Sequence, residues 1–149
     1  MSGSTETAPR PKTGLRLLLV EDNPLNQRVA QLFLQKLGVC FDTATDGQEA
    51  VAAIGKQAYD VVVLDVQMPH MDGLEATRQI RAMYGAMNRP YIIGLTAHAF
   101  SSDRDEGLRA GMDDYMQKPL DFARLAAALE RAEKVLVQKG SPGQVRTEG

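Results

Sequence analysis

Short apolar segments alternate with longer amphipathic ones over most of this 149-residue chain. The most continuous apolar segment is VVVL at residues 61–64, in which three of the four side chains are β-branched. An apolar run without a polar break is typical of a strand that is covered on both faces. Four further segments have the length and apolar content of strands. The predicted strands are residues 15–20, 39–44, 60–65, 91–96 and 113–117.

Between these strands, apolar residues recur at helical spacing. Asn23 suits a helix N-cap, Pro24 the first helical position, and Gly38 the helix end. The alternation predicts an α/β fold, a flavodoxin-like doubly wound sheet of five parallel strands in the order 2-1-3-4-5, with five helices. The strand at 39–44 is less uniformly apolar, which favours a place nearer an edge. The predicted helices are residues 24–37, 46–57, 72–84, 103–110 and 121–137.

Composition separates the ends of the chain from its middle. Residues 1–14 are small, polar and proline-containing, which predicts a disordered linker or an expression remnant. Residues 138–149 are predicted to be a disordered tail, so the predicted domain is residues 15–137. The net charge of −2 gives no electrostatic basis for binding nucleic acid.

The apolar runs are strand-sized, so we expect no membrane contact by this segment, and a cytoplasmic location. The single cysteine, Cys40, excludes an internal disulfide. It lies in an apolar run, and we expect a buried, unreactive thiol there.

Polar side chains stand where the predicted strands end. Glu21 and Asp22 follow the first strand, Asp65 ends the third, Thr96 ends the fourth, and Lys118 follows the fifth. The carboxyl ends of parallel strands meet at one edge of a sheet, so these side chains should converge. Three carboxylates repel one another unless a cation lies among them. Lys118 supplies one positive charge, and a hard divalent cation such as Mg²⁺ would supply the rest.

This combination of residue types suits phosphoryl transfer. A carboxylate can attack a phosphoryl group and hold it as an aspartyl phosphate, and Asp65 is the best candidate because its strand is the most central. Mg²⁺ and Lys118 would neutralise the phosphoryl oxygens, and the Thr96 hydroxyl would donate a hydrogen bond to one of them. Taken singly, Asp65 is better explained as the cap of the turn that follows it, Thr96 as a strand-end cap, and Lys118 as a surface lysine. Their joint occurrence at the strand ends favours the functional interpretation.

At these positions the sequence resembles the response-regulator receiver domain family. The matching segments are LLVEDN, VVVLDVQMPHMDG, GLTA and KP, spread over residues 15 to about 137. The resemblance implies that Asp65 is the phosphoacceptor, and that Mg²⁺ binds Glu21, Asp22, Asp65 and the backbone carbonyl of Gln67.

The resemblance also implies that Thr96 and Lys118 bind the phosphoryl group, that the peptide bond before Pro119 is cis, and that Tyr115 is the switch aromatic. The segment VEDNPLNQRVA is most similar to receiver domains of hybrid sensor histidine kinases. Such receivers take phosphate from a histidine kinase and pass it to a histidine phosphotransfer domain. The cytoplasmic part of a membrane-bound sensor kinase is then one possible origin of the chain.

The predicted helix at 24–37 carries two leucines outside its apolar face. Leu25 and Leu32 are seven residues apart and form one ridge at the margin of that face. Two surface leucines are unremarkable in themselves. The functional interpretation is a docking ridge for a helix of a histidine phosphotransfer domain, together with Pro119.

Other functions fit the sequence less well. A haloacid-dehalogenase-like phosphatase needs a second aspartate at the position of Gln67, and a dinucleotide-binding domain needs a G-x-G-x-x-G segment after the first strand. A receiver-like module that is never phosphorylated typically lacks the acidic pair, the acceptor or the lysine. A stand-alone single-domain response regulator that acts through protein–protein interaction remains an alternative. In either case the chain would catalyse its own phosphorylation and dephosphorylation.

Overall fold

The computed structural model describes residues 15–66, 73–84, 90–97 and 101–138. Five parallel strands form one sheet in the order β2-β1-β3-β4-β5, which confirms the predicted flavodoxin-like topology. The strands are β1 (Arg16–Val20), β2 (Cys40–Ala44), β3 (Val61–Asp65), β4 (Tyr91–Thr96) and β5 (Asp114–Gln117). The helices are α1 (Pro24–Leu37), α2 (Gly47–Lys56), α3 (Gly73–Tyr84), α4 (Ser101–Ala110) and α5 (Phe122–Gln138).

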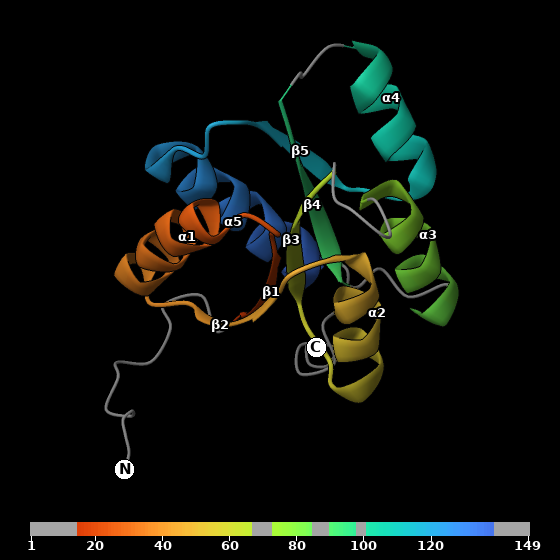
Figure 1. Cartoon of the computed structure of the whole chain (residues 1–149), viewed down its shortest axis with the longest axis horizontal. Helices are drawn as coiled ribbons and strands as arrows, with labels where there is room; N and C mark the ends of the chain where they lie inside the picture. The colour runs from red at the N-terminus through yellow and green to blue at the C-terminus, as the bar shows by residue number, and fades with distance from the viewer. Residues whose placement is uncertain (1–14, 67–72, 85–89, 98–100, 139–149) are drawn as a thin grey trace.

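Helices cover both faces of the sheet. Figure 1 shows α1 and α5 on one side of the strands, and α2, α3 and α4 on the other. The alternation of side chains along β1, β3 and β4 sends odd-numbered residues such as Leu17 and Val63 to the face of α1 and α5, and even-numbered residues such as Leu18 and Val62 to the face of α2 and α3. Both faces of β3 are therefore covered, and all five of its residues are buried.

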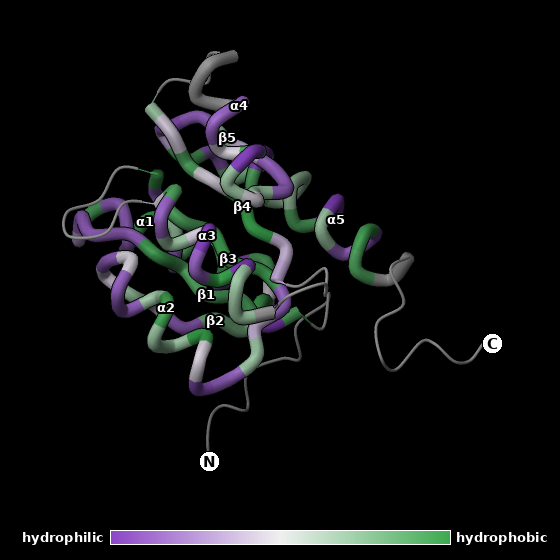
Figure 2. The backbone as a smooth tube through the Cα atoms, turned by 90° about the vertical axis from the view of Figure 1, so that its right-hand side faces the viewer, coloured by the Kyte–Doolittle hydropathy of each residue, from purple (hydrophilic) through white to green (hydrophobic). Residues whose placement is uncertain are grey.

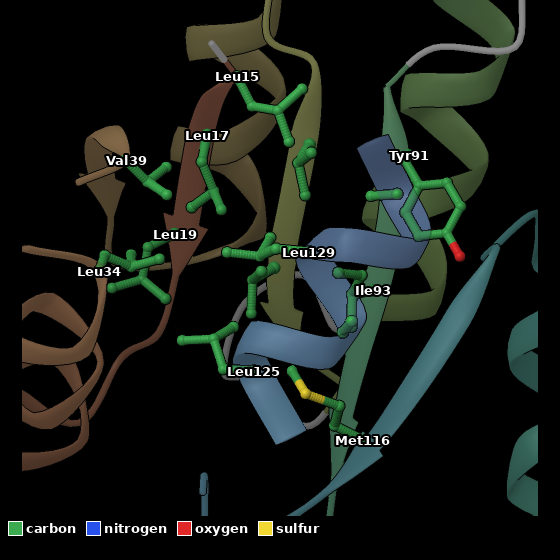
Figure 3. Packing of buried hydrophobic residues seen from close by; sticks show 14 of the residues in the cluster. Leu15, Leu17, Leu19, Leu34, Val39, Tyr91, Ile93, Met116, Leu125 and Leu129 are labelled. Atoms are coloured by element: carbon green, nitrogen blue, oxygen red, sulfur yellow. The ribbon is translucent and has the colours of Figure 1, made fainter. Parts of the chain in front are cut away.

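The core on the α1–α5 side is a continuous apolar layer. In Figure 3, Leu125 and Leu129 of α5 point toward Leu17, Leu19 and Ile93 of the sheet. Along the tube in Figure 2, apolar colour follows the central strands, and the helices alternate between polar and apolar residues. Burial of a large apolar side chain contributes about 1.5–3 kcal/mol, so this layer fixes how the strand ends lie relative to one another.

Local signals set the helix ends. The Asn23 side chain accepts hydrogen bonds from the amides of Leu25 (2.9 Å) and Asn26 (3.1 Å), and Gly38 ends α1 in the left-handed region at φ 73°. Asp46 caps α2 by accepting from the Glu49 amide at 2.9 Å. Each such cap contributes about 1 kcal/mol. Within the described ranges, no helix combines the length and the apolar character needed to cross a bilayer.

The predicted bounds agree with the structure to within two residues. The helix at 24–37 and the strand at 91–96 are observed as predicted, α4 begins two residues earlier, and α5 ends one residue later. β2 is an edge strand, as its composition suggested. The prediction for Cys40 was wrong, because its side chain is exposed. An edge strand has a neighbour on one side only, so an apolar stretch there does not guarantee burial.

Candidate functional site

The side chains expected to converge all stand at the carboxyl edge of the sheet. Val20 pairs with Leu64, and Asp65 pairs with Leu95, so the register carries the residues after β1 and at the ends of β3 and β4 to the same edge. Glu21, Asp65 and Thr96 are each 2% exposed. The connection from β2 to β3 passes β1, so the direction in which strands are added reverses between β1 and β3, and ligands bind at such switch points in open α/β sheets.

A lysine and an aspartate form the centre of the site. The Lys118 ammonium donates a hydrogen bond to Asp65 Oδ2 at 2.5 Å, and the Lys118 amide donates to the Thr96 carbonyl at 2.7 Å. The Asp65 side chain is 3% exposed, while the Lys118 side chain is 27% exposed. The ammonium therefore reaches from the solvent side of the site to a buried carboxylate, where a charge-assisted hydrogen bond is strong.

Three carboxylates share this edge. Oxygen atoms of Glu21, Asp22 and Asp65 all lie within 4.8 Å of one another. The three negative charges exceed the single positive charge of Lys118. Hard oxygen donors at this spacing are the ligands that Mg²⁺ prefers, so the donor set fits a divalent cation of this kind.

Glu21 is held in place by the first turn of α1. Its carboxylate accepts hydrogen bonds from the Asn23 amide (3.2 Å) and the Asn26 side-chain amide (3.5 Å). The Gln27 side chain donates to the Glu21 carbonyl at 2.6 Å. On a helical wheel of residues 24–37, Gln27 lies opposite the apolar face, but in the structure its side chain is half-buried and supports the site. Two side-chain amides in one helical turn next to an acidic pair are the signal that would have indicated this contact.

Burial raises the pKa of the Glu21 carboxyl above its usual value, and the negative charge of Asp65 raises it further. The hydrogen bond from the Asn23 amide and the positive charge of Lys118 act in the opposite direction. A cation bound among the carboxylates would likewise favour the ionised form. The site therefore carries an excess of negative charge, which Lys118 compensates only in part.

The peptide bond between Lys118 and Pro119 is cis, as the resemblance implied. A cavity of about 370 Å³ opens beside it, between α1 and the segment that links β5 to α5. Its lining is mainly apolar, with Glu21, Asn26 and Lys118 at one part of the wall, and the remaining lining residues are Leu19, Val29, Ala30, Leu95, Ala97, Pro119 and Leu120.

Two further predictions concern residues around the site. Leu25 and Leu32 are 71% and 46% exposed on α1, so the predicted ridge faces solvent. Tyr115 is half-buried in β5, and its ring packs near α4, where a Cβ on Gly107 would lie 3.3 Å from Tyr115 Cε1. Gln67, the expected backbone ligand, lies outside the described residues.

The fold and the site together define a flavodoxin-like α/β protein with an acidic cluster and a lysine at its switch point. The response regulator receiver domain model matches residues 17–130, and the chain belongs to this family. It is therefore a receiver domain of two-component signalling.

A curated relative of this chain is a much longer protein. The chain is 37% identical over 129 residues to the sensor protein GacS of Pseudomonas syringae pv. syringae, a match that covers 85% of this chain and 14% of GacS. The chain thus spans about a seventh of the length of that relative.

Solved structures share both the fold and the sequence. The receiver domain of a sensor histidine kinase from Pseudomonas aeruginosa PAO1, which holds a magnesium ion in its active site cleft, is 42% identical, with a TM-score of 0.74 over 80% of this chain and 98% of that one. The Saccharomyces cerevisiae receiver domain of Ssk1, in complex with the histidine phosphotransfer protein Ypd1, is 30% identical, with a TM-score of 0.75 over 85% of this chain and 92% of that one.

Proposed function

We propose that Asp65 accepts a phosphoryl group from a phosphohistidine and passes it on to a histidine phosphotransfer partner. The observation that carries this proposal is the contact of 2.5 Å between the Lys118 ammonium and the buried Asp65 carboxylate, beside two further carboxylates. A nucleophilic carboxylate next to a fixed positive charge is the arrangement that phosphoryl transfer requires.

In this reaction an Asp65 oxygen forms a bond to phosphorus while the bond from phosphorus to the donor imidazole nitrogen breaks. The imidazole nitrogen keeps the electron pair, and the product is an aspartyl phosphate. Lys118 stabilises the negative charge on the phosphoryl oxygens, and the Thr96 hydroxyl donates a hydrogen bond to one of them. Thr96 is suited to this role because it ends β4 at the same edge of the sheet.

Mg²⁺ is the proposed cofactor, held by Glu21, Asp22, Asp65 and the backbone carbonyl of Gln67. When bound, it neutralises charge on the phosphoryl oxygens and leaves positions open for them. Asp22 is the exposed member of the cluster. Removing its charge by Asp22→Ala should raise the Mg²⁺ concentration needed for phosphorylation without displacing the buried residues.

The partner docks on α1 and the segment after β5. Leu25 and Leu32 provide an exposed apolar ridge, and Pro119 lines the neighbouring cavity beside Lys118. An apolar surface next to a buried nucleophile suits a helix that must bring a histidine to Asp65. The Ypd1 complex of a related receiver supports a histidine phosphotransfer domain as the kind of partner.

Phosphorylation acts through Thr96 and Tyr115. The phosphoryl oxygens draw the Thr96 hydroxyl inward, and the Tyr115 ring moves into the space that it leaves. Similarity to the receiver domain of a sensor histidine kinase and to a hybrid signal transduction histidine kinase supports an origin in a hybrid histidine kinase. We infer a cytoplasmic location for this domain. A stand-alone response regulator with the same chemistry is the alternative.

The decisive experiment is phosphorylation by acetyl phosphate, followed by intact mass. We expect a mass increase of one phosphoryl group with Mg²⁺ and none with EDTA. Asp65→Asn should abolish the increase because the nucleophile is gone. Asp60→Asn, at the opposite end of the β3 segment, is the matched control and should be phosphorylated normally. Equal phosphorylation of wild type and Asp65→Asn would overturn the assignment.

A further inference from the structure

One buried polar side chain has no part in the proposed reaction. Within the part of the chain that the structure describes, the buried polar residues are Glu21, Asp65, Thr96 and Thr77. The first three belong to the site, whereas Thr77 lies in the second turn of α3 and is completely buried. Its hydroxyl donates a hydrogen bond of 2.7 Å to the carbonyl of Gly73, the first residue of α3.

Gly73 in turn packs directly on the backbone of the phosphoacceptor strand. A Cβ at this position would lie 2.7 Å from the Asp65 carbonyl oxygen and 2.7 Å from the Val66 α-carbon. Both of these atoms belong to the backbone and cannot rotate away as the end of a side chain can. Any side chain at residue 73 would therefore push the start of α3 and the end of β3 apart.

Hydrogen bonds join the same residues. The Gly73 amide donates to the Val66 carbonyl at 2.7 Å, and the Val66 amide donates to the Leu95 carbonyl at 2.9 Å. A chain of contacts therefore runs from Thr77 through Gly73 to Val66, the residue that follows Asp65, and from there to β4. A threonine hydroxyl often bonds the carbonyl four residues earlier in a helix. Here that carbonyl belongs to the residue that touches the acceptor backbone.

We propose that Gly73 and Thr77 are positioning residues for Asp65: Gly73 allows α3 to approach the acceptor backbone, and the Thr77 hydroxyl holds Gly73 in that place. This inference rests on the proposed function of Asp65. The reaction depends on where the Asp65 oxygens lie relative to Lys118 and Thr96, and a displacement of the reacting group by about 1 Å can cost about a hundredfold in rate. Neither residue is among those proposed to bind the phosphoryl group or the metal.

The first test compares two glycines. Gly73→Ala should lower the rate constant of phosphorylation by acetyl phosphate at least about tenfold. Gly55→Ala is the matched control, because a Cβ at Gly55 of α2 meets no atom within 4 Å, and its rate should equal that of wild type. Rates are measured at saturating Mg²⁺, at a temperature where urea denaturation shows each variant to be fully folded.

The second test separates the hydroxyl of Thr77 from its shape and also serves if Gly73→Ala does not fold. Thr77→Val keeps the branched shape and loses the hydroxyl, and should lower the rate about fivefold, the equivalent of one hydrogen bond. Thr77→Ser keeps the hydroxyl and loses a methyl group, and should retain the wild-type rate although it is less stable. A purely structural role predicts equal rates for all three folded proteins.

The outcomes distinguish this inference from the proposed function. If wild type is not phosphorylated at Asp65, the proposed function fails. If wild type is phosphorylated and folded Thr77→Val reacts as fast as Thr77→Ser, the inference fails while the function stands. A reduced phosphorylation rate for Thr77→Val, together with wild-type rates for Thr77→Ser and Gly55→Ala, supports the inference.

Discussion

At the scale of single residues, the site depends on the balance between one ammonium and three carboxylates. Asp65 is almost completely buried, and its charge is compensated by Lys118, which is partly open to solvent. Breaking a buried pair by removing one partner is costly because the remaining charge keeps its desolvation penalty. The same imbalance that favours a cation therefore makes Lys118 important for stability.

We predict that Lys118→Ala lowers the free energy of unfolding by roughly 2 kcal/mol in the absence of metal, because the buried carboxylates lose their cation. Mg²⁺ should stabilise this variant more than wild type, since it would replace part of the missing charge. Urea denaturation with and without Mg²⁺ measures both effects. Lys56 is an exposed lysine of α2, and Lys56→Ala is the control. It should change neither the stability without metal nor the stabilisation by Mg²⁺. Equal stability of Lys118→Ala and wild type would contradict the prediction.

A second residue-scale prediction concerns alkaline pH. Burial raises the pKa of Tyr59 to about 12, and its hydrogen bond of 2.6 Å to the Asp42 carboxylate acts in the same direction. The pKa of Tyr91 is also raised to about 12, chiefly by burial. In the unfolded chain both hydroxyls ionise near pH 10, so the native state holds these protons more tightly. Their contribution is complete below about pH 10 and is lost as the pH rises through about 12.

The free energy of unfolding should therefore fall between about pH 10 and 12, by at most about 1.4 kcal/mol per pH unit for each tyrosine. At pH 8 the free energy of unfolding of Tyr59→Phe should be about 1 kcal/mol lower than that of wild type, because a hydrogen bond is removed. At high pH it should fall less steeply than that of wild type. Urea denaturation at pH 8, 10 and 11 tests this. A variant whose stability fell as steeply as that of wild type would show that Tyr59 does not titrate as proposed.

At the scale of elements, the first turn of α1 supports the site, and the exposed margin of α1 is the proposed docking surface. Asn23 caps the helix, while Asn26 and Gln27 bind Glu21. Further along, the Phe33 ring meets the Phe122 ring of α5 edge to face, with centroids 5.5 Å apart. The helix is thus anchored at both ends, and Leu25 and Leu32 remain outside its packed face.

We predict that Leu25→Asp and Leu32→Asp impair phosphoryl transfer between Asp65 and a histidine phosphotransfer domain at least about tenfold, because a charge replaces an apolar contact in the docking ridge. Phosphorylation by acetyl phosphate should be unchanged, since this small donor needs no docking surface. Leu108→Asp is the matched control, because Leu108 of α4 is 49% exposed and lies away from α1. Wild-type transfer rates in both α1 variants would exclude the ridge as the interface.

At the scale of the whole molecule, the sheet connects the site to α4. Gly94 lies two residues before Thr96 in β4, and it pairs with Tyr115 of β5. The Met112 side chain fills the space beside Gly94 and Gly107, where a Cβ would lie 2.6 and 3.0 Å from its sulfur. A rearrangement of Thr96 and Tyr115 would therefore reach α4 through packed atoms.

We predict that beryllofluoride, a phosphoryl mimic, with Mg²⁺ shifts NMR amide resonances from Thr96 through Tyr115, including α4. A ligand changes the population of two states only when it contacts them differently, and the proposed movement of Thr96 would provide that difference. Asp65→Asn is the control and should show no such shifts. Shifts limited to residues that touch the ligand would argue against a two-state response.

The sequence alone determined the elements, their order in the sheet and the edge where the site lies. Periodicity, caps and strand-end residues are local properties, and the parallel topology then places Glu21, Asp65, Thr96 and Lys118 at one edge. The tertiary structure decided how the carboxylates are held and which surfaces are open. The contact of Gln27 with Glu21 and the approach of Gly73 to Asp65 depend on how the start of a helix is placed against the end of a strand, and the exposure of Cys40 depends on its place in an edge strand. These features depend on how the elements pack against one another in three dimensions, and the periodicity that predicts each element does not specify that packing.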